Sequence, residues 1–328
     1  MIKLKDINYE RIGVKGELFL AEENPNEGFN FPYTLFIPEN VDKNTSLIVE
    51  GANTGRPRNN IKDAVNDVIE RCMNITIIRC NTKTKFSILT PCFPRIYTKE
   101  DGEIYTHILS SKALNYENHG LKRVDNQLVN MINDALNLLK EKEINVDSKV
   151  ILDGFSASAK FVNHFTLLHP EVVKLVIAGA CSGTGILPLK EIDGEKLLYP
   201  IGTGNMDEIT EEKHDKFKNI KQFYYMGTLN PLDNDPFGER KDGTPVSTSS
   251  ITKEEREQLY KFIGKKMLPD RWENFQRIYK SLGVNATFKT YDGFGHTPEP
   301  AVQEIEELLK QEVKRKTITL KQEKWWSY

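Results

Sequence analysis

Residues 149–169 read KVILDGFSASAKFVNHFTLLH, and this stretch decides the fold. The apolar run at 149–154 is typical of a buried strand, and residues 158–169 continue as a helix. A second apolar run, VVKLVIAGA at 172–180, follows after a short turn. Strand–helix–strand units of this kind build a parallel sheet with helices on both faces. The sequence therefore predicts an α/β fold with a mostly parallel central sheet.

The same alternation continues on both sides of this unit. Further strands are predicted at 16–23, 31–39, 46–50, 75–80, 222–227 and 286–293, the first two as an antiparallel pair, and helices at 60–73, 123–143, 270–282 and 300–315. Three long irregular segments, 81–119, 181–221 and 228–268, are expected to be loops or a lid that shape a substrate pocket. We expect a single domain over residues 1–328.

Charge and composition argue against several classes of partner. The chain has 45 Lys and Arg against 47 Asp and Glu, a net charge of -2, so it has no global field to attract nucleic acid or an anionic membrane. No apolar stretch approaches the roughly 18 residues that a membrane span requires, and the first residues lack the apolar core of a signal peptide. A cytoplasmic protein is therefore expected. The four cysteines are scattered and do not indicate a disulfide framework.

The candidate nucleophile is Ser156, in the sequence Gly154-Phe155-Ser156-Ala157-Ser158 between the predicted strand and helix. A sharp strand-to-helix turn requires small flanking residues, as in the G-x-S-x-G nucleophile elbow, and Ser158 replaces the second glycine. The elbow would hold the Ser156 hydroxyl above the sheet. The alternative is an ordinary turn in which Ser156 caps the helix.

The candidate general base is His296, in a glycine-rich loop after the last predicted strand and before the last helix. This position fits the chain order serine, acid, histidine of α/β-hydrolases. Solvated or capping roles are expected for the other histidines, which are His107, His119, His164, His169 and His214.

Two aspartates after the predicted strand at 222–227 are candidates for the triad acid. Asp233 is preferred, because Asp235 precedes Pro236 and is well placed to shape a turn. Oxyanion donors are expected to be the backbone N–H of Ala157 and that of Ala52, with Asn53 as second choice. A plain glycine-containing turn is the alternative at 50–55.

Taken together, these residues resemble the α/β-hydrolase superfamily. The stretch VDSKVILDGFSASAKFVNHFTLLHPEVVKLVIAGACSG is similar to the corresponding region of polyhydroxybutyrate-depolymerase-like and feruloyl-esterase-like carboxylesterases. The resemblance implies Ser156 as nucleophile, Asp233 as acid and His296 as base. The chain departs from the family pattern in its longer acid loop, where Asn230 has the spacing expected of the acid.

The sequence thus predicts a serine hydrolase, in particular a carboxylesterase acting on a small-molecule ester. Such a reaction needs no metal or organic cofactor, and the histidines lack metal-ligand spacing. Two alternatives stay open. The same triad serves acyltransferases and peptidases, and a hydrolase scaffold can also act as a non-catalytic binding protein.

Overall fold

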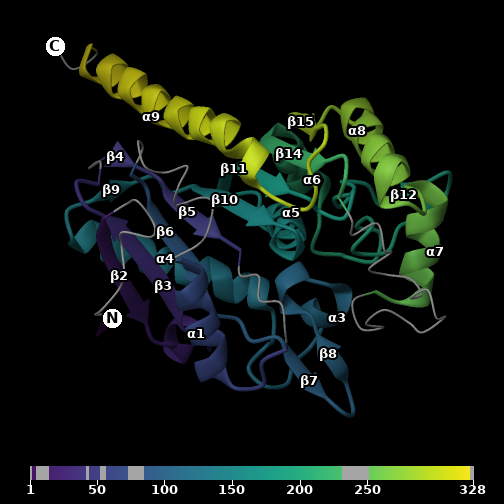
Figure 1. Cartoon of the computed structure of the whole chain (residues 1–328), viewed down its shortest axis with the longest axis horizontal. Helices are drawn as coiled ribbons and strands as arrows, with labels where there is room; N and C mark the ends of the chain where they lie inside the picture. Colours follow the sequence, from purple (N-terminus) through teal and green to yellow (C-terminus); the bar gives the residue numbers. More distant parts are fainter. Residues whose placement is uncertain are drawn as a thin grey trace.

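The computed structural model describes residues 2–4, 15–41, 44–51, 57–72, 85–230 and 251–325. Its centre is a nine-stranded sheet, which crosses the middle of Figure 1. In spatial order the strands are β1 (Ile2–Lys3), β2 (Gly16–Ala21), β3 (Tyr33–Pro38), β6 (Ser87–Pro91), β5 (Leu47–Glu50), β10 (Val150–Phe155), β11 (Val173–Gly179), β14 (Lys221–Gly227) and β15 (Ala286–Tyr291).

Most of this sheet is parallel. The six strands from β6 to β15 each run parallel to their neighbours, whereas β1, β2 and β3 join them as an antiparallel edge. The predicted antiparallel pair of opening strands is confirmed as β2 and β3. Because these strands are parallel, the carboxyl ends of β5, β10, β14 and β15 lie along one edge of the sheet.

Helices cover both faces of the sheet. The helices are α1 (Ile61–Cys72), α3 (Ser111–Leu114), α4 (Val124–Glu141), α5 (Ala157–Leu168), α6 (Glu211–Asn219), α7 (Lys253–Phe262), α8 (Trp272–Ser281) and α9 (Val302–Trp325). One core cluster joins the sheet to α4, α5 and α8, and a second joins its other face to α1 and α9. Neighbouring residues of β10 alternate between these clusters, with Ile151 in one and Leu152 in the other, so the strand is buried on both sides.

The described residues also form small two-stranded sheets that are separate from the nine-stranded sheet. They pair β4 (Asn44–Thr45) with β9 (Asn145–Val146), β7 (Ile96–Thr98) with β8 (Gly102–Ile104), and β12 (Glu191–Ile192) with β13 (Glu195–Lys196). The segment 81–119 is more ordered than its sequence indicates, because β6 within it is a strand of the central sheet. The segment 228–268 contributes α7, while the strand predicted at 75–80 lies outside the described residues.

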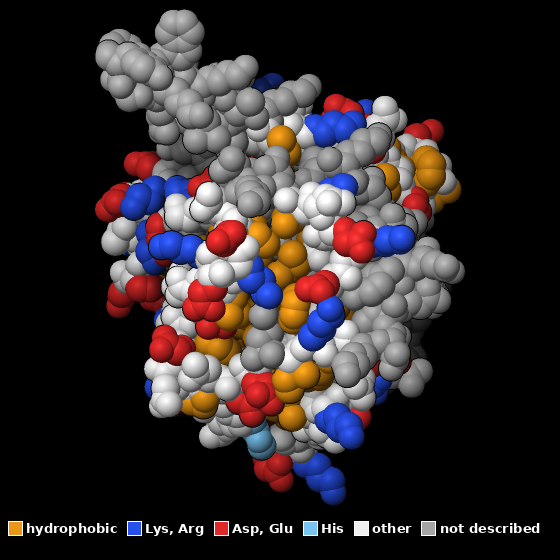
Figure 2. All heavy atoms as spheres, turned by 90° about the vertical axis from the view of Figure 1, so that its left-hand side faces the viewer, with side chains coloured by type: hydrophobic (Ala, Val, Ile, Leu, Met, Phe, Trp, Pro, Cys, Tyr) orange, Lys and Arg blue, Asp and Glu red, His pale blue; other side chains and the backbone are white. Residues whose placement is uncertain are grey.

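The surface carries charges of both signs. In Figure 2, Lys and Arg side chains are interspersed with Asp and Glu over one face, and apolar side chains are visible between them. None of the helices among the described residues is long and apolar enough to cross a bilayer.

Candidate active site

Ser156 lies at the point where β10 ends and α5 begins. Its backbone has φ 64° and ψ -117°, a conformation that side-chain-bearing residues rarely adopt. Its backbone N–H donates to the carbonyl of Gly179, 2.8 Å away on the neighbouring strand β11. The Ser156 side chain makes no capping hydrogen bond to the helix, so the alternative of a helix-capping serine does not describe this turn.

The residues around Ser156 show why the turn needs small side chains. A Cβ atom on Gly154 would lie 2.4 Å from the backbone oxygen of Ser158, so only glycine fits there. Ser158, which replaces the usual second glycine, is buried, and its hydroxyl bridges the backbone of Phe155. It accepts from the Phe155 N–H at 2.9 Å and donates to the Phe155 carbonyl at 3.0 Å. The substitution therefore ties the turn together.

The loop that carries His296 is attached to the chain that follows β14. The Leu229 N–H donates to the carbonyl of Phe294 at 2.8 Å, and Thr228 Oγ1 accepts from the Gly293 N–H at 2.9 Å. A Cβ on Gly227 would lie 2.3 Å from the Phe294 carbonyl oxygen, so this close approach also requires glycine. The end of β14 thus holds the loop that follows β15.

The ring of His296 lies beside the strand end that carries Ser156. Its centroid is 4.7 Å from that of Phe155, the residue immediately before Ser156, with the rings tilted by 51°. Burial lowers the pKa of His296 below its ordinary value, because the charged imidazolium loses solvation. His296 is therefore neutral at pH 7, the state that a general base requires.

One ring nitrogen of His296, Nδ1, is a buried polar atom, and such atoms need a hydrogen-bond partner. This atom has no hydrogen-bond partner among the described residues. The acid candidates Asp233 and Asp235 lie outside these residues. The described chain reaches Asn230, whose side-chain amide donates to the sulfur of Met226 at 3.3 Å.

Half of the expected oxyanion hole is described. Ala157 is the first residue of α5, so its N–H belongs to the group of unbonded donors at a helix N-terminus. Ala52 and Asn53 lie outside the described residues. Gly51, directly before them, donates its N–H to the Asp153 carbonyl at 2.9 Å, so this loop starts beside β10.

Four of the other histidines, His107, His164, His169 and His214, are buried rather than solvated, which corrects the sequence-based expectation. His107 Nε2 lies 3.0 Å from the Phe93 carbonyl, His164 Nδ1 lies 3.0 Å from that of Ile108, and His214 Nε2 lies 2.8 Å from Thr203 Oγ1. Their partners are distant in sequence, which is why local patterns do not reveal them. His119 is exposed, as expected, and stacks against Tyr116.

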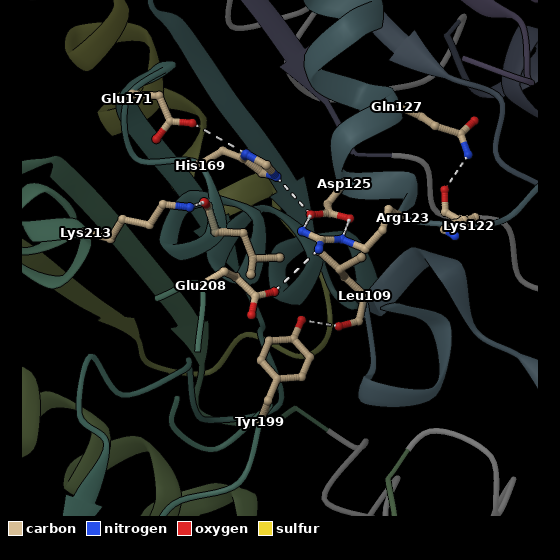
Figure 3. A network of polar contacts seen from close by, with 11 residues as sticks. Leu109, Lys122, Arg123, Asp125, Gln127, His169, Glu171, Tyr199, Glu208 and Lys213 are labelled. Carbon is tan, nitrogen blue, oxygen red and sulfur yellow. Dashed lines mark hydrogen bonds and ion pairs between the residues drawn. The ribbon is translucent and has the colours of Figure 1, made fainter. Parts of the chain in front are cut away.

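His169 caps the end of α5 opposite to Ser156 and belongs to a buried ionic network, shown in Figure 3. Its Nε2 atom lies 2.9 Å from Asp125 Oδ2, and Asp125 also accepts two hydrogen bonds from Arg123, at 2.9 and 2.7 Å. Burial alone would raise the pKa of Asp125, but its hydrogen bonds with Arg123 and His169 lower that pKa to about 2. The network anchors α5 to the start of α4.

Asp125→Ala is expected to lower the free energy of unfolding by about 3 kcal/mol, because it leaves the buried His169 and the Arg123 guanidinium without their shared carboxylate. Urea unfolding measures the change. The matched control is Asp215→Ala, which removes an exposed carboxylate from α6. A loss no larger than that of the control would show that the network is not needed for stability.

The sequence analysis also missed a buried pair of carboxyl groups on the neighbouring strands β5 and β10. Glu50 and Asp153 are paired neighbours on β5 and β10, and each is 7% exposed. Burial raises the pKa of Asp153 to about 6, although a hydrogen bond with Glu50 opposes this rise. The only signal in the sequence was an acid in each of the predicted strands at 46–50 and 149–154.

Comparisons with known proteins give matches in structure only. No family model matches the chain, and no curated protein matches it in sequence. Poly(aspartic acid) hydrolase-1 from Sphingomonas sp. KT-1 superposes with a TM-score of 0.55 at 15% identity, over 90% of this chain and 98% of that one. An S-formylglutathione hydrolase from Agrobacterium tumefaciens has a TM-score of 0.49 at 11% identity, over 96% and 99% of the two chains. A ferulic acid esterase has a TM-score of 0.47 at 14% identity, over 90% and 97%.

The first of these likenesses extends over nearly the full length of both chains. At such low identity it concerns the fold and not the reaction. The sheet and its covering helices agree with it, and the resemblance stated from the sequence is borne out at this level. This protein has the α/β-hydrolase fold.

Proposed function

We propose that this protein is a serine carboxylesterase, with Ser156 as nucleophile and His296 as general base. The observation that carries the proposal is the strained backbone of Ser156 beside a neutral, half-buried histidine ring. Strain of this kind persists where surrounding structure enforces it, and it is typical of sites that must present a reactive atom. The solved structure with a TM-score of 0.55 is named as a hydrolase, which agrees with a hydrolytic reaction.

The proposed reaction is acyl transfer through an acyl-enzyme. His296 removes the hydroxyl proton of Ser156 while Oγ attacks the ester carbonyl, and the Ala157 N–H donates to the oxyanion. The protonated His296 then gives its proton to the departing alcohol. Water, activated by the same imidazole, attacks the acyl-enzyme, and release of the carboxylic acid restores Ser156.

The triad acid is proposed to be Asp233, with Asp235 as the alternative. Both follow β14 closely in sequence, and the end of β14 is bonded to the loop that carries His296. A carboxylate there would accept from His296 Nδ1, hold the tautomer and stabilise the imidazolium. This assignment would give a function to the Nδ1 atom, which has no hydrogen-bond partner among the described residues.

A pair of isosteric substitutions separates the two acids. Asp233→Asn is expected to lower kcat by about 10⁴-fold, because an amide favours the wrong imidazole tautomer, whereas Asp235→Asn should change it by less than about tenfold. Hydrolysis of p-nitrophenyl acetate measures both. The reverse pattern would assign Asp235, and unaltered kcat in both variants would remove the acid from this segment.

Labelling by a fluorophosphonate probe tests the proposed function directly. The wild-type protein is expected to be labelled, with the adduct on the peptide that contains Ser156, and to hydrolyse p-nitrophenyl acetate. Absence of both labelling and hydrolysis would favour a binding protein on a hydrolase scaffold.

A further inference from the structure

Two buried acids lie side by side where β5 and β10 end. Glu50 is the last residue of β5, and Asp153, its partner in the strand pairing, lies three residues before Ser156. Each is 7% exposed, although acidic side chains are rarely buried without a partner. The proposed mechanism gives neither carboxyl group a part in the chemistry, so their burial needs another explanation.

The two carboxyl groups are joined by a hydrogen bond. A carboxylate oxygen only accepts hydrogen bonds, so one of the two groups must carry a proton and donate it to the other. Burial favours this state because it penalises charge. It raises the pKa of Asp153 to about 6, and a second negative charge beside the first costs more again. At neutral pH the pair therefore shares one proton.

The backbone makes further contacts between β5 and the turn that carries Ser156. The Gly51 N–H donates to the carbonyl of Asp153 at 2.9 Å. A Cβ atom on Gly51 would lie 2.7 Å from the Cβ atom of Ser158, so the backbone directly after Glu50 lies against the first turn of α5. The end of β5 is thus packed against the residues that flank Ser156.

This junction joins the chain segments that are expected to supply the oxyanion donors. Ala157 is the first residue of α5, and Ala52 and Asn53 come directly after Gly51 in the sequence. Backbone donors stabilise an oxyanion only within hydrogen-bond distance of it, and a displacement of about 1 Å can lower a rate by about 10²-fold. The spacing between the ends of β5 and β10 therefore bears on catalysis.

We propose that Glu50 and Asp153 are positioning residues for the esterase reaction. The hydrogen bond between their side chains holds the end of β5 against the end of β10, and with it the spacing of the backbone donors around the oxyanion. Its effect is on the transition state, because the negative charge on that oxygen develops only there. This inference rests on the proposed esterase function, since without an oxyanion there is nothing to position.

Loss of the hydrogen bond is expected to lower kcat and to leave KM nearly unchanged. Glu50→Ala deletes the carboxyl group, and Glu50→Asp keeps it but shortens the side chain by one methylene. With p-nitrophenyl acetate, kcat should fall by about 10²-fold in both variants, while KM changes by less than about threefold. The Ki of phenylboronic acid, which forms a tetrahedral adduct with a reactive serine, should rise by the same factor as kcat/KM falls.

Amide substitutions should preserve the activity. In Glu50→Gln and in Asp153→Asn the amide N–H donates to the remaining carboxylate, so kcat should stay within about fivefold of wild type. The matched control is Glu312→Ala, which removes another glutamate that is 7% exposed, in this case one on α9 that is paired with Lys174. It should lower the stability and keep both kcat and KM.

Infrared spectroscopy reads the shared proton without reference to activity. The difference spectrum of wild type minus Glu50→Gln at neutral pH is expected to contain the carbonyl band of a protonated carboxyl group, because the amide replaces the proton donor. A difference spectrum without this band would overturn the shared proton.

The outcomes separate this inference from the proposed function. An active wild type whose Glu50→Ala and Glu50→Asp variants keep kcat, or lose affinity in KM alone, would overturn the positioning role and leave the esterase standing. An equal fall of kcat in Glu50→Gln would do the same. A wild type that neither hydrolyses esters nor reacts with the fluorophosphonate would overturn both proposals. If Glu50→Ala fails to fold by circular dichroism, Glu50→Asp, which retains the carboxyl group, decides.

Discussion

Ser156→Ala is expected to lower kcat for ester hydrolysis by about 10⁶-fold, because it removes the atom that forms the acyl-enzyme. The folded structure should persist. Alanine fits the same turn as serine, and the Ser156 side chain makes no capping bond to α5 that the substitution would remove. Initial rates with p-nitrophenyl acetate measure the activity, and circular dichroism during heating measures the stability.

The matched control is Ser281→Ala, which removes an exposed hydroxyl at the end of α8. It should hydrolyse the ester at the wild-type rate. Activity that persists in purified Ser156→Ala, above the level of a mock preparation, would rule out Ser156 as the nucleophile.

His296→Ala is the second change with a very large expected effect, about 10⁴- to 10⁶-fold in kcat, since Ser156 then has no base to accept its proton. The dependence of kcat/KM on pH in the wild-type protein tests the same assignment of His296 as the base. Burial lowers the pKa of His296, and the base acts in its neutral form. Hence kcat/KM should be level at pH 7 to 8 and fall about tenfold per pH unit at acid pH, with the fall beginning below about pH 6.5.

His119→Ala is the control, because His119 is exposed. It should keep both the rate and the pH profile. A wild-type profile that is flat down to pH 4.5, or full activity in His296→Ala, would contradict the assignment of the base.

Local patterns were enough to predict the strand-to-helix turn at Ser156 and the strand and helix on either side of it. The apolar run before Gly154 and the small residues after it are features of neighbouring positions, which a single sequence displays directly. The strand β6 was missed because SILTP ends in a proline, is short, and is defined by pairing with β3 and β5 rather than by its own alternation.

Local sequence patterns could not predict the partners of buried polar groups. The partner of His164 is 56 residues away in the chain, and Asp125 is 44 residues from His169. Whether a histidine or an aspartate is solvated depends on these distant partners, so composition and spacing give no signal. The triad acid has a different difficulty, because Asp233 and Asp235 lie two residues apart and satisfy the same sequence criterion.

The helix α5 is fixed at both of its ends by unrelated means. At its start the Ser158 hydroxyl holds the backbone of Phe155, and at its end His169 is bound to Asp125. Because α5 is held at both ends, it cannot slide along its axis or rotate about it. The apolar residues that pack against α5 can therefore be exchanged while Ser156, at the start of the helix, keeps its position.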